Sequence, residues 1–435
     1  MGVILGDNCV KKIWITTLWE SNPLMGERSR LERANQLANF LSSQGYDVTL
    51  WFTTFQHSDK KYIHNKSKIV DINEKLHMVL VHCPIPYKKN TSPIRFLHLS
   101  MIAREMKRLI KNKTQFPTPD LIFCSYPPEQ YCKVSLDYAE KPNIPVVIDA
   151  RDLWPDIFER AIPQKLRFLS GMILSPMKRR TTSVFKRANA ICAMSPATFA
   201  WALNYAEREQ TELDRYIFIG SEYKEPEQDV LCANLKEWEE KGITKETWNV
   251  CLFTVLSKTS QDIDTVIDAV KKIHDIYPQI RFVVGGTGDD FDRLLELTKN
   301  ISYILFCGWL NKDQMTSLMY ISKVGMLCYR NTQDFKDGWG NKVGQYLSYG
   351  LPYLKSATGV AKAYAEQYGC GLAYKEGDSI ELASCIQSLI EDDEKYKRLS
   401  GNASACFMRD FESNAINARF EQMINEVYDN HYKID

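Results

Sequence analysis

Short apolar runs alternate with helical patterns along nearly the whole chain of 435 residues, and this alternation limits the possible folds more than any other feature. The apolar runs of the first half are KIWITTL, DVTLWFTT, MVLVH, DLIFCS, PVVIDA, AICAM and YIFIG, and those of the second half are VCLFTVL, IRFVVGG, YILFCG, VGMLCY and LPYLK. Strands that are apolar throughout are buried on both faces, with the intervening helices as cover. The pattern therefore predicts an α/β protein with doubly wound parallel sheets.

The length of the chain predicts two domains, because one hydrophobic core rarely grows to this size. We expect a Rossmann-like domain over residues 1–220, a second over 221–412, and a C-terminal helix over 413–435 that could pack back on the first domain. A polar stretch with one proline, SEYKEPEQDVLCANL, suits the hinge. Ligands of doubly wound domains bind at the carboxyl ends of the strands, so two facing domains would hold a substrate between them.

Composition narrows the class of protein. A net charge of +1 argues against nucleic acid as the main partner. The twelve cysteines form no CxxC pair and no Cys/His cluster, which fits a reducing cytoplasm better than a disulfide framework. The start of the chain lacks the features of a secretion signal, and no apolar run reaches the ~18–20 residues of a membrane helix. We expect a cytoplasmic protein that is soluble or lies on a membrane surface.

A glycine-rich turn follows the apolar run IRFVVGG. Gly286 and Gly288 would let the backbone turn tightly beside a ligand, at a helix start that favours anions. A purely structural turn is an equally good interpretation. Asp290 and Asp292 have the spacing of a metal-binding DxD, but acidic residues at a helix start are explained by the helix dipole, and we expect no metal.

The stretch DGWGNKVGQYLSYGLP gives a stronger indication of a phosphorylated ligand. Gly338 and Gly340 bracket Trp339, and Asn341 and Lys342 then begin a helix, with Asn341 as a good N-cap. Free N–H groups at such a helix start, with a lysine beside them, suit a diphosphate.

At this point the sequence resembles a known family. The order FTVLS, GGTGDD, FCGWL and DGWGNKVGQYLSYGLP is similar to the donor-binding half of GT-B glycosyltransferases of family 4. The strings CSYPPEQY, IPVVIDARDLWPD and ANAICAMSP are similar to the members that build bacterial surface polysaccharides, and RDLWPD is the most specific of them. The resemblance implies two Rossmann-like domains, a nucleotide-sugar donor on the C-terminal domain, an acceptor on the N-terminal domain, and retention of the anomeric configuration.

Members of this family usually carry two glutamates across the loop and helix of that stretch. The matching positions here are Asp337 and Gln345. The resemblance implies that Asp337 lies near the donor sugar as a catalytic carboxylate. Gln345 would accept hydrogen bonds from ribose hydroxyl groups through its amide oxygen, which is a weaker acceptor than a carboxylate.

The family also offers an arginine and a lysine to the diphosphate after the first strand of the donor domain. This chain has Lys258 there but no arginine, with Thr254 and Ser257 as hydroxyl donors and Arg330 as a further candidate. A solvated loop lysine is the structural alternative. Trp309 lies where the family's base-binding loop passes, and it either contacts a nucleobase or belongs to the core.

On the acceptor side, the run PVVIDA delivers Arg151 and Asp152 at its carboxyl end. Asp152 is the catalytic candidate, because a carboxylate there could accept a proton from an acceptor hydroxyl or orient it. A structural Arg–Asp pair is the alternative. Gly26 and Arg28, in the loop after the first strand, could meet an acceptor phosphate or close over the donor diphosphate.

Two segments, IRFLHLSMIAREMKRLIKNK and KLRFLSGMILSPMKRRTTSVFKRANA, mix basic and apolar residues. Helices of this kind either lie on anionic lipid or turn their apolar side to the domain core, and both interpretations stay open. A lipid-linked acceptor, common in the resembling family, favours peripheral contact with the cytoplasmic face of the membrane.

Taken with the resemblance, the sequence predicts a retaining glycosyltransferase of bacterial surface-polysaccharide synthesis. It would move a sugar from a nucleotide-diphosphate sugar, a UDP-sugar foremost, to a glycan or a polyprenyl-diphosphate-linked acceptor, without a metal or other cofactor. Two alternatives remain: a nucleotide-sugar epimerase on the same architecture, and a non-catalytic glycosyltransferase-like partner protein, which Gln345 and the missing arginine suggest.

Overall fold

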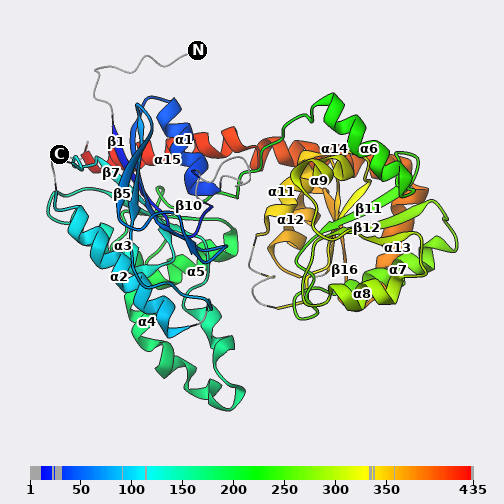
Figure 1. Ribbon diagram of the computed structural model, residues 1–435, viewed down its shortest axis with the longest axis horizontal. Coiled ribbons are helices and arrows are strands. Elements are labelled where there is room, and N and C mark those ends of the chain that lie inside the picture. The colour runs from blue at the N-terminus through cyan, green and yellow to red at the C-terminus, as the bar shows by residue number, and fades with distance from the viewer. Residues whose placement is uncertain are drawn as a thin grey trace. The chain divides into compact units, whose positions relative to one another are not determined.

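The chain forms two compact units, one of residues Met1–Phe218 with Ile416–Asp435 and one of residues Ile219–Ala415 (Figure 1). The sequence places the first boundary between residues 220 and 221 and begins the last helix at residue 413. The computed structural model describes residues 11–21, 24, 32–90, 92–112, 115–332, 336, 339–356 and 358–432.

The first unit is built on an eight-stranded sheet with the strand order β10-β9-β8-β7-β1-β2-β6-β5. Its strands are β1 Lys12–Thr16, β2 Asp47–Thr53, β5 Lys68–Asn73, β6 Leu76–Val81, β7 Leu121–Tyr126, β8 Val146–Ala150, β9 Ala190–Ala193 and β10 Arg215–Tyr216. All neighbours pair in parallel except β5 and β6. A short hairpin of β3 Phe55–Gln56 and β4 Lys61–Tyr62 stands apart from the sheet.

Helices connect these strands as the alternation predicts. They are α1 Arg33–Ser43, α2 Pro93–Leu109, α3 Glu129–Ala139, α4 Ser170–Lys186 and α5 Pro196–Ala206, with the short 3-10 helices η2 Asp156–Ala161 and η3 Gln164–Leu169 before α4. The central strands are buried throughout, as in LIFCSY of β7, because helices cover both faces of a parallel sheet.

The last helix, α15 Ser413–Tyr432, packs largely on the first unit, to which its residues from Ile416 onward belong. The Phe420 ring meets the Phe123 ring of β7 edge-on at 5.5 Å. The Arg33 guanidinium lies 4.4 Å from the centre of the same Phe420 ring. The chain therefore returns to complete the core of the unit with which it began.

The second unit is built on a six-stranded sheet, wholly parallel, with the order β13-β12-β11-β14-β15-β16. Its strands are β11 Trp248–Phe253, β12 Ile280–Gly285, β13 Ile304–Phe306, β14 Val324–Leu327, β15 Tyr353–Ser356 and β16 Gly371–Tyr374. Its helices are α6 Gln228–Glu240, α7 Ile263–His274, α8 Phe291–Thr298, α9 Lys312–Tyr320, α11 Asn341–Ser348, α12 Val360–Tyr368, α13 Ser379–Glu391 and α14 Asp393–Asp410.

The antiparallel strand β5 at the edge of the first sheet was not expected from the run of parallel strands. Its partly exposed residues explain why no apolar run marks it.

In the second sheet, α11 lies so close to β14 that a Cβ added at Gly325 would fall 2.3 Å from the Tyr346 ring. Helix α11 is therefore held firmly against the strand at whose carboxyl end the predicted site lies.

Candidate functional site

The glycine-rich turn after β12 packs against the loop after β11. At Gly286, where φ is +143°, an added Cβ would lie 1.8 Å from the carbonyl oxygen of Thr254, and at Gly288 it would lie 2.1 Å from that of Leu256. Only glycine fits such close backbone contact. The structural interpretation accounts for both glycines, because they let the turn after β12 pack on the loop after β11.

The start of α11 differs from the prediction. The N-cap is Gly340, whose backbone is extended, and Asn341 is the first helical residue and is exposed. Among the residues that the structure describes, no side chain caps this helix start, and none accepts from the Asn341 or Lys342 backbone N–H group. The N-cap is therefore one residue earlier than expected.

Lys342 connects the start of α11 to the carboxyl ends of two strands. Its Nζ donates to Tyr329 Oη at 2.9 Å and reaches Thr254 Oγ1 at 3.4 Å. It also lies 5.2 Å from the centre of the Tyr329 ring. The structure thus brings together two residues that the sequence assigned to the donor, Thr254 and Lys342, and adds Tyr329, which the sequence analysis missed.

Gln345 lies one turn further along α11 and is half-buried. Its side-chain amide makes no hydrogen bond to any residue that the structure describes, while its backbone carbonyl accepts from Ser348 Oγ at 2.7 Å. Asp337 and Gly338, which the sequence assigned to the same site, lie outside the described residues.

Trp339 is placed differently from the prediction. Its side chain is only 4% exposed and stacks on Phe411 with ring centres 5.4 Å apart, and it meets the Tyr364 ring edge-on at 5.2 Å. Trp339, which the sequence placed among the donor-binding residues, therefore cannot offer its side chain to a donor, and it anchors the segment before α11 in the core of the second unit. The signal that could have shown this is the aromatic residue at position 411, close in space but distant in sequence.

Trp309, in contrast to Trp339, has an exposed side chain. The sequence left open a nucleobase contact and a place in the core, and the side chain is 76% exposed, which excludes the core. Val255, after β11, is also strongly exposed at 70%. Trp309 and Val255 are therefore apolar side chains available to a flat ligand at the carboxyl ends of β13 and β11.

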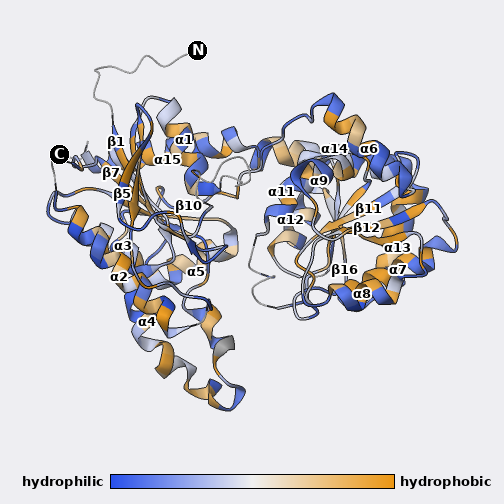
Figure 2. Cartoon of the chain, viewed as in Figure 1, coloured by the Kyte–Doolittle hydropathy of each residue, from blue (hydrophilic) through white to orange (hydrophobic). Residues whose placement is uncertain are grey.

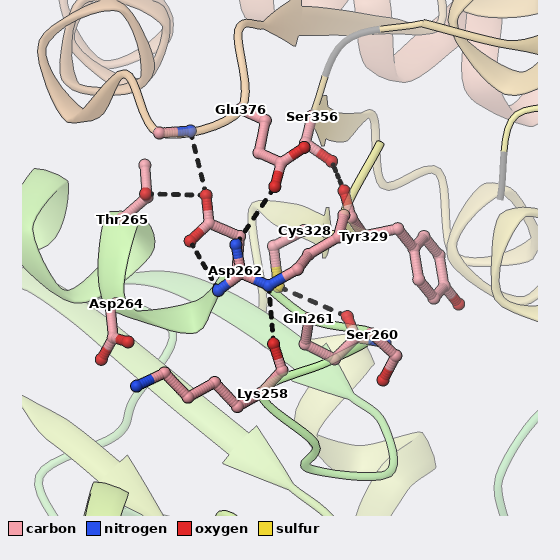
Figure 3. A network of polar contacts seen from close by, with 12 residues as sticks. Lys258, Ser260, Gln261, Asp262, Asp264, Thr265, Cys328, Tyr329, Ser356 and Glu376 are labelled. Carbon is pink, nitrogen blue, oxygen red and sulfur yellow. Dashed lines mark hydrogen bonds and ion pairs between the residues drawn. The ribbon is translucent and has the colours of Figure 1, made fainter. Parts of the chain in front are cut away.

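A network of charges fixes the loops at this edge of the sheet (Figure 3). Arg330, after β14, donates to the Lys258 carbonyl at 2.6 Å and pairs with Glu376 at 3.1 Å. The Asp262 carboxylate accepts from Thr265 Oγ1 at 2.8 Å and from the Gly377 amide at 3.0 Å, and lies 3.7 Å from Arg330. Arg330 is thus committed to other parts of the protein, and its suggested help to a diphosphate does not fit this geometry.

Lys258 itself is exposed, and its ammonium is drawn away from the network in Figure 3. Ser257 Oγ lies 3.0 Å from Thr259 Oγ1 in the same loop. These two residues remain available to a ligand at the mouth of the site.

The Asp290–Asp292 spacing is explained without a metal. Asp290 pairs with Arg293 at 2.6 Å, and hydrogen bonding to that guanidinium lowers the pKa of Asp290. Within the part of the chain that the structure describes, no three potential metal ligands gather.

In the first unit, the carboxyl end of β8 carries the acceptor-side candidates. The buried Arg–Asp pair exists, but its members are Asp149 and Arg33 of α1, joined by two hydrogen bonds of 2.8 and 2.9 Å. Arg151 instead pairs with Glu20, a buried carboxylate that also accepts from the Ala34 and Asn35 amides. Arg33 and Glu20 could not be identified from the sequence, since nothing in it matches them to partners so far along the chain.

Asp152 lies at a cavity of about 210 Å³ lined also by Trp19, Glu20 and Arg151. The residue is exposed, while partial burial of its carboxyl group raises its pKa against hydrogen bonds from the Leu153 amide and the Trp154 side chain. A carboxylate with a raised pKa holds a proton more readily, which suits contact with an acceptor hydroxyl. Gly26 and Arg28 lie outside the described residues.

Comparison with known proteins agrees with this geometry. Residues 236–405 match the family model described as Glycosyl transferases group 1. No curated protein sequence matches the chain.

Three solved structures show what the fold is similar to. Sucrose-phosphate synthase from Thermosynechococcus elongatus has a TM-score of 0.67 and 15% identity, over 96% of this chain and 99% of that one. Alr3699/HepE of Anabaena in complex with UDP has a TM-score of 0.61 and 17% identity, over 96% and 100%. WaaG, a glycosyltransferase involved in lipopolysaccharide biosynthesis, has a TM-score of 0.60 and 13% identity, over 95% and 99%.

Identities this low show the fold alone, and that fold is the GT-B arrangement of α/β domains with parallel sheets, as the sequence predicted. The family-model match falls within the second unit, which holds the α11 site described above.

Proposed function

We propose that this chain is a retaining glycosyltransferase that moves a sugar from a nucleotide-diphosphate sugar to a glycan or lipid-linked acceptor in bacterial surface-polysaccharide synthesis. The observation that carries the proposal is the start of α11, where free N–H groups and Lys342 meet the carboxyl ends of β11 and β14 within the segment that matches the family model. A UDP-sugar is the first candidate donor, since the similar Anabaena structures are complexes with UDP and UDP-glucose.

The donor residues would act by position and charge rather than by covalent chemistry. Thr254, Lys342 and the amides of α11 would hold the leaving diphosphate, which gains negative charge as the glycosidic bond to the sugar breaks. Trp309 would lie against the nucleobase, and Gln345 would accept hydrogen bonds from the ribose. Asp337 would lie near the sugar, as the family resemblance implies.

On the acceptor side, Asp152 would accept a hydrogen bond or a proton from the attacking hydroxyl. Its raised pKa supports this role, because a general base is most effective when its pKa is nearer the working pH. Arg151, fixed by Glu20, would orient the acceptor beside it.

The acceptor would be linked to lipid at the cytoplasmic face of the membrane, and the exposed side chains of one segment support this. In η3 and the start of α4, Phe168 is 81% exposed and Met172 is 75% exposed, next to the exposed basic residues Lys165, Arg167 and Arg179. Figure 2 shows hydrophobic and hydrophilic residues alternating along α4. The alternative that these apolar side chains face the core does not fit their exposure. No helix among the described residues is long and apolar enough to span a membrane.

Binding of nucleotides tests the donor half of the proposal. A thermal-shift screen of the full chain with nucleoside diphosphates and nucleotide sugars should show stabilisation by at least one, because a ligand that binds only the folded state raises the apparent stability. Failure of the whole panel would sink the proposal. Conversion of a free nucleotide sugar to an isomer without an acceptor would replace it with an epimerase.

Flotation with lipid vesicles tests the membrane half. The wild-type chain should float with vesicles of phosphatidylglycerol and not with those of phosphatidylcholine, since basic residues add attraction to anionic lipid. The double variant Phe168→Ser, Met172→Ser should lose this binding. The matched control is Ile380→Ser, Met408→Ser, which removes two strongly exposed apolar side chains from the second unit and should float as before.

A further inference from the structure

Lys355, on β15, is a buried cation without an acceptor. It is 3% exposed, and its Nζ makes no hydrogen bond to any residue that the structure describes. Burial lowers its pKa to about 8, against the nearby Cys328 and Glu376, which raise it. An ammonium group that is largely withdrawn from water and has no hydrogen-bond partner among the described residues gains stability when an anion binds beside it.

The position of Lys355 indicates what that partner is. In the sheet it pairs with Leu327, the last residue of β14, and its Nζ lies 5.3 Å from the centre of the Tyr329 ring. The Nζ of Lys342 lies 5.2 Å from the centre of the same ring. Both ammonium groups therefore lie about 5 Å from the centre of the Tyr329 ring. An anion beside that ring would be attracted to both charges.

The start of α11 adjoins the Tyr329 hydroxyl group. A Cβ added at Gly340, the N-cap, would lie 3.6 Å from Tyr329 Oη, which Lys342 contacts directly. The helix start and Lys342 therefore meet at the same tyrosine whose ring Lys355 approaches. Helix N-termini and lysine ammonium groups together bind phosphate oxygens.

We propose that Lys355, Lys342 and the first amides of α11 form an anion site that takes the diphosphate of the donor, and that Lys355 replaces the arginine that this chain lacks after β11. The inference rests on the proposed function for the identity of the ligand. Arg330 fits this role less well, because it is committed to Glu376 and Asp262. Lys258 is exposed on the loop after β11 and is a further candidate for the same anion.

Calorimetric titration of the full chain with UDP, with inorganic pyrophosphate and with uridine tests the site. In Lys355→Met the affinity for UDP and for pyrophosphate should fall about tenfold or more, the size of one lost charge-assisted hydrogen bond, while any affinity for uridine stays the same. The matched control is Lys397→Met, which removes an exposed lysine of α14 paired with Asp393 and should change nothing. Thermal melting of both variants confirms that they fold.

Proton uptake gives a readout that a merely structural lysine would not change. An anion beside Lys355 favours its charged form, so binding of pyrophosphate at pH 8 should draw a proton into the wild-type chain and not into Lys355→Met. Titration in buffers of different ionisation enthalpy measures this uptake. The other titratable groups that face Lys355 are Cys328, Tyr329, Lys342 and Glu376, and they are the same in the variant.

The outcomes separate the two proposals. If UDP and pyrophosphate bind Lys355→Met as tightly as the wild type, the anion site is overturned while the donor proposal stands. If the wild type binds pyrophosphate through Lys355 but no nucleotide, the anion site stands and the donor proposal fails. If the wild type binds neither, both fail.

Discussion

Two buried cations, Arg33 of the first unit and Lys355 of the second, have opposite surroundings. Arg33 of the first unit is 3% exposed and donates to both oxygens of Asp149 and to the carbonyls of Ile217 and Phe218. Lys355 of the second unit is equally buried and has no acceptor among the described residues.

The pKa of each cation follows from this difference. Burial alone would lower the pKa of Arg33, but the Asp149 carboxylate outweighs it and the pKa is raised. Burial of Lys355 meets only weak opposition, and its pKa falls to about 8. We infer that Arg33, whose contacts are completed within the chain, holds the fold, whereas Lys355 is left to bind a ligand. The four predictions below test this distinction, from the largest expected effect to the smallest.

The largest effect is expected at Asp149. The substitution Asp149→Asn would leave Arg33 buried with its charge unpaired, and should lower the free energy of unfolding by about 3–5 kcal/mol. Denaturation with urea measures the change. Asp393→Asn is the control, because the Asp393–Lys397 pair is almost fully exposed and should cost less than about 1 kcal/mol. Equal effects of the two variants would show that the buried pair carries no special weight.

Lys355 should behave in the opposite way. At pH 7 its forced charge destabilises the folded chain, so Lys355→Met should raise the free energy of unfolding by up to about 3 kcal/mol, from 1.36 kcal/mol per pKa unit. A lowered lysine pKa means that above pH 8 the unfolded chain holds a proton that the folded chain has lost. The wild type therefore gains stability as pH rises from about 8 toward 10.5, and the advantage of the variant shrinks over that range.

Urea denaturation at pH 7 and pH 9.5 measures this change, and Lys397→Met should show no such dependence. Saturating UDP should also reduce the advantage of the variant, because the wild type binds UDP more tightly. A variant that is less stable than the wild type at pH 7 would place Lys355 among the completed groups and remove the contrast with Arg33.

The sequence predicted the regular parts of the fold and missed features that depend on local geometry. Periodicity predicted the alternating strands and helices and the parallel sheets, because burial on both faces leaves an apolar run in each strand. It did not predict β5, whose edge position leaves Ile69 and Val70 only partly buried and the pattern broken. The helix start at residues 340–342 could be located from its glycines, but the N-cap itself depends on a backbone angle and was misplaced by one residue.

Contacts between residues far apart in the chain could not be predicted from the sequence. Arg33 and Asp149 are 116 positions apart, and neither is marked as the partner of the other. The same holds for Trp339, which is buried because Phe411 stacks on it, and for Lys355, whose burial follows from the packing of β15. Trp309 shows the reverse case, since an aromatic residue equally suited to a core turned out to be exposed.

Gly286 also contributes to the fold, through close backbone packing against Thr254. In Gly286→Ala the new Cβ would clash with the Thr254 carbonyl at a backbone angle that alanine rarely adopts, which should lower the free energy of unfolding by about 2–3 kcal/mol. Thermal melting measures the loss. The control Gly171→Ala places the same methyl group on α4 where no atom lies within 4 Å, and should be neutral or slightly stabilising. Comparable losses in both variants would mean that the β11–β12 contact is not tight.

Gln345, like Lys355, has a polar side chain without a partner among the described residues. Its substitution should therefore change ligand affinity rather than stability. Its amide makes no hydrogen bond within the described part of the chain, so Gln345→Glu should leave the melting temperature of the free protein nearly unchanged. A carboxylate is a stronger acceptor than an amide by about 1 kcal/mol for ribose hydroxyl groups, which corresponds to roughly fivefold tighter binding of UDP.

A ligand without a ribose provides the control for the Gln345→Glu prediction. Inorganic pyrophosphate carries no ribose, so its affinity should be the same for Gln345→Glu and the wild type, or slightly weaker because of the added negative charge. Calorimetry with UDP and pyrophosphate thus separates a ribose contact from a general electrostatic effect. If UDP and pyrophosphate respond alike, Gln345 does not face the ribose. The donor would then lie elsewhere along α11 than Gln345 indicates, although Lys342 and Lys355 could still bind its diphosphate.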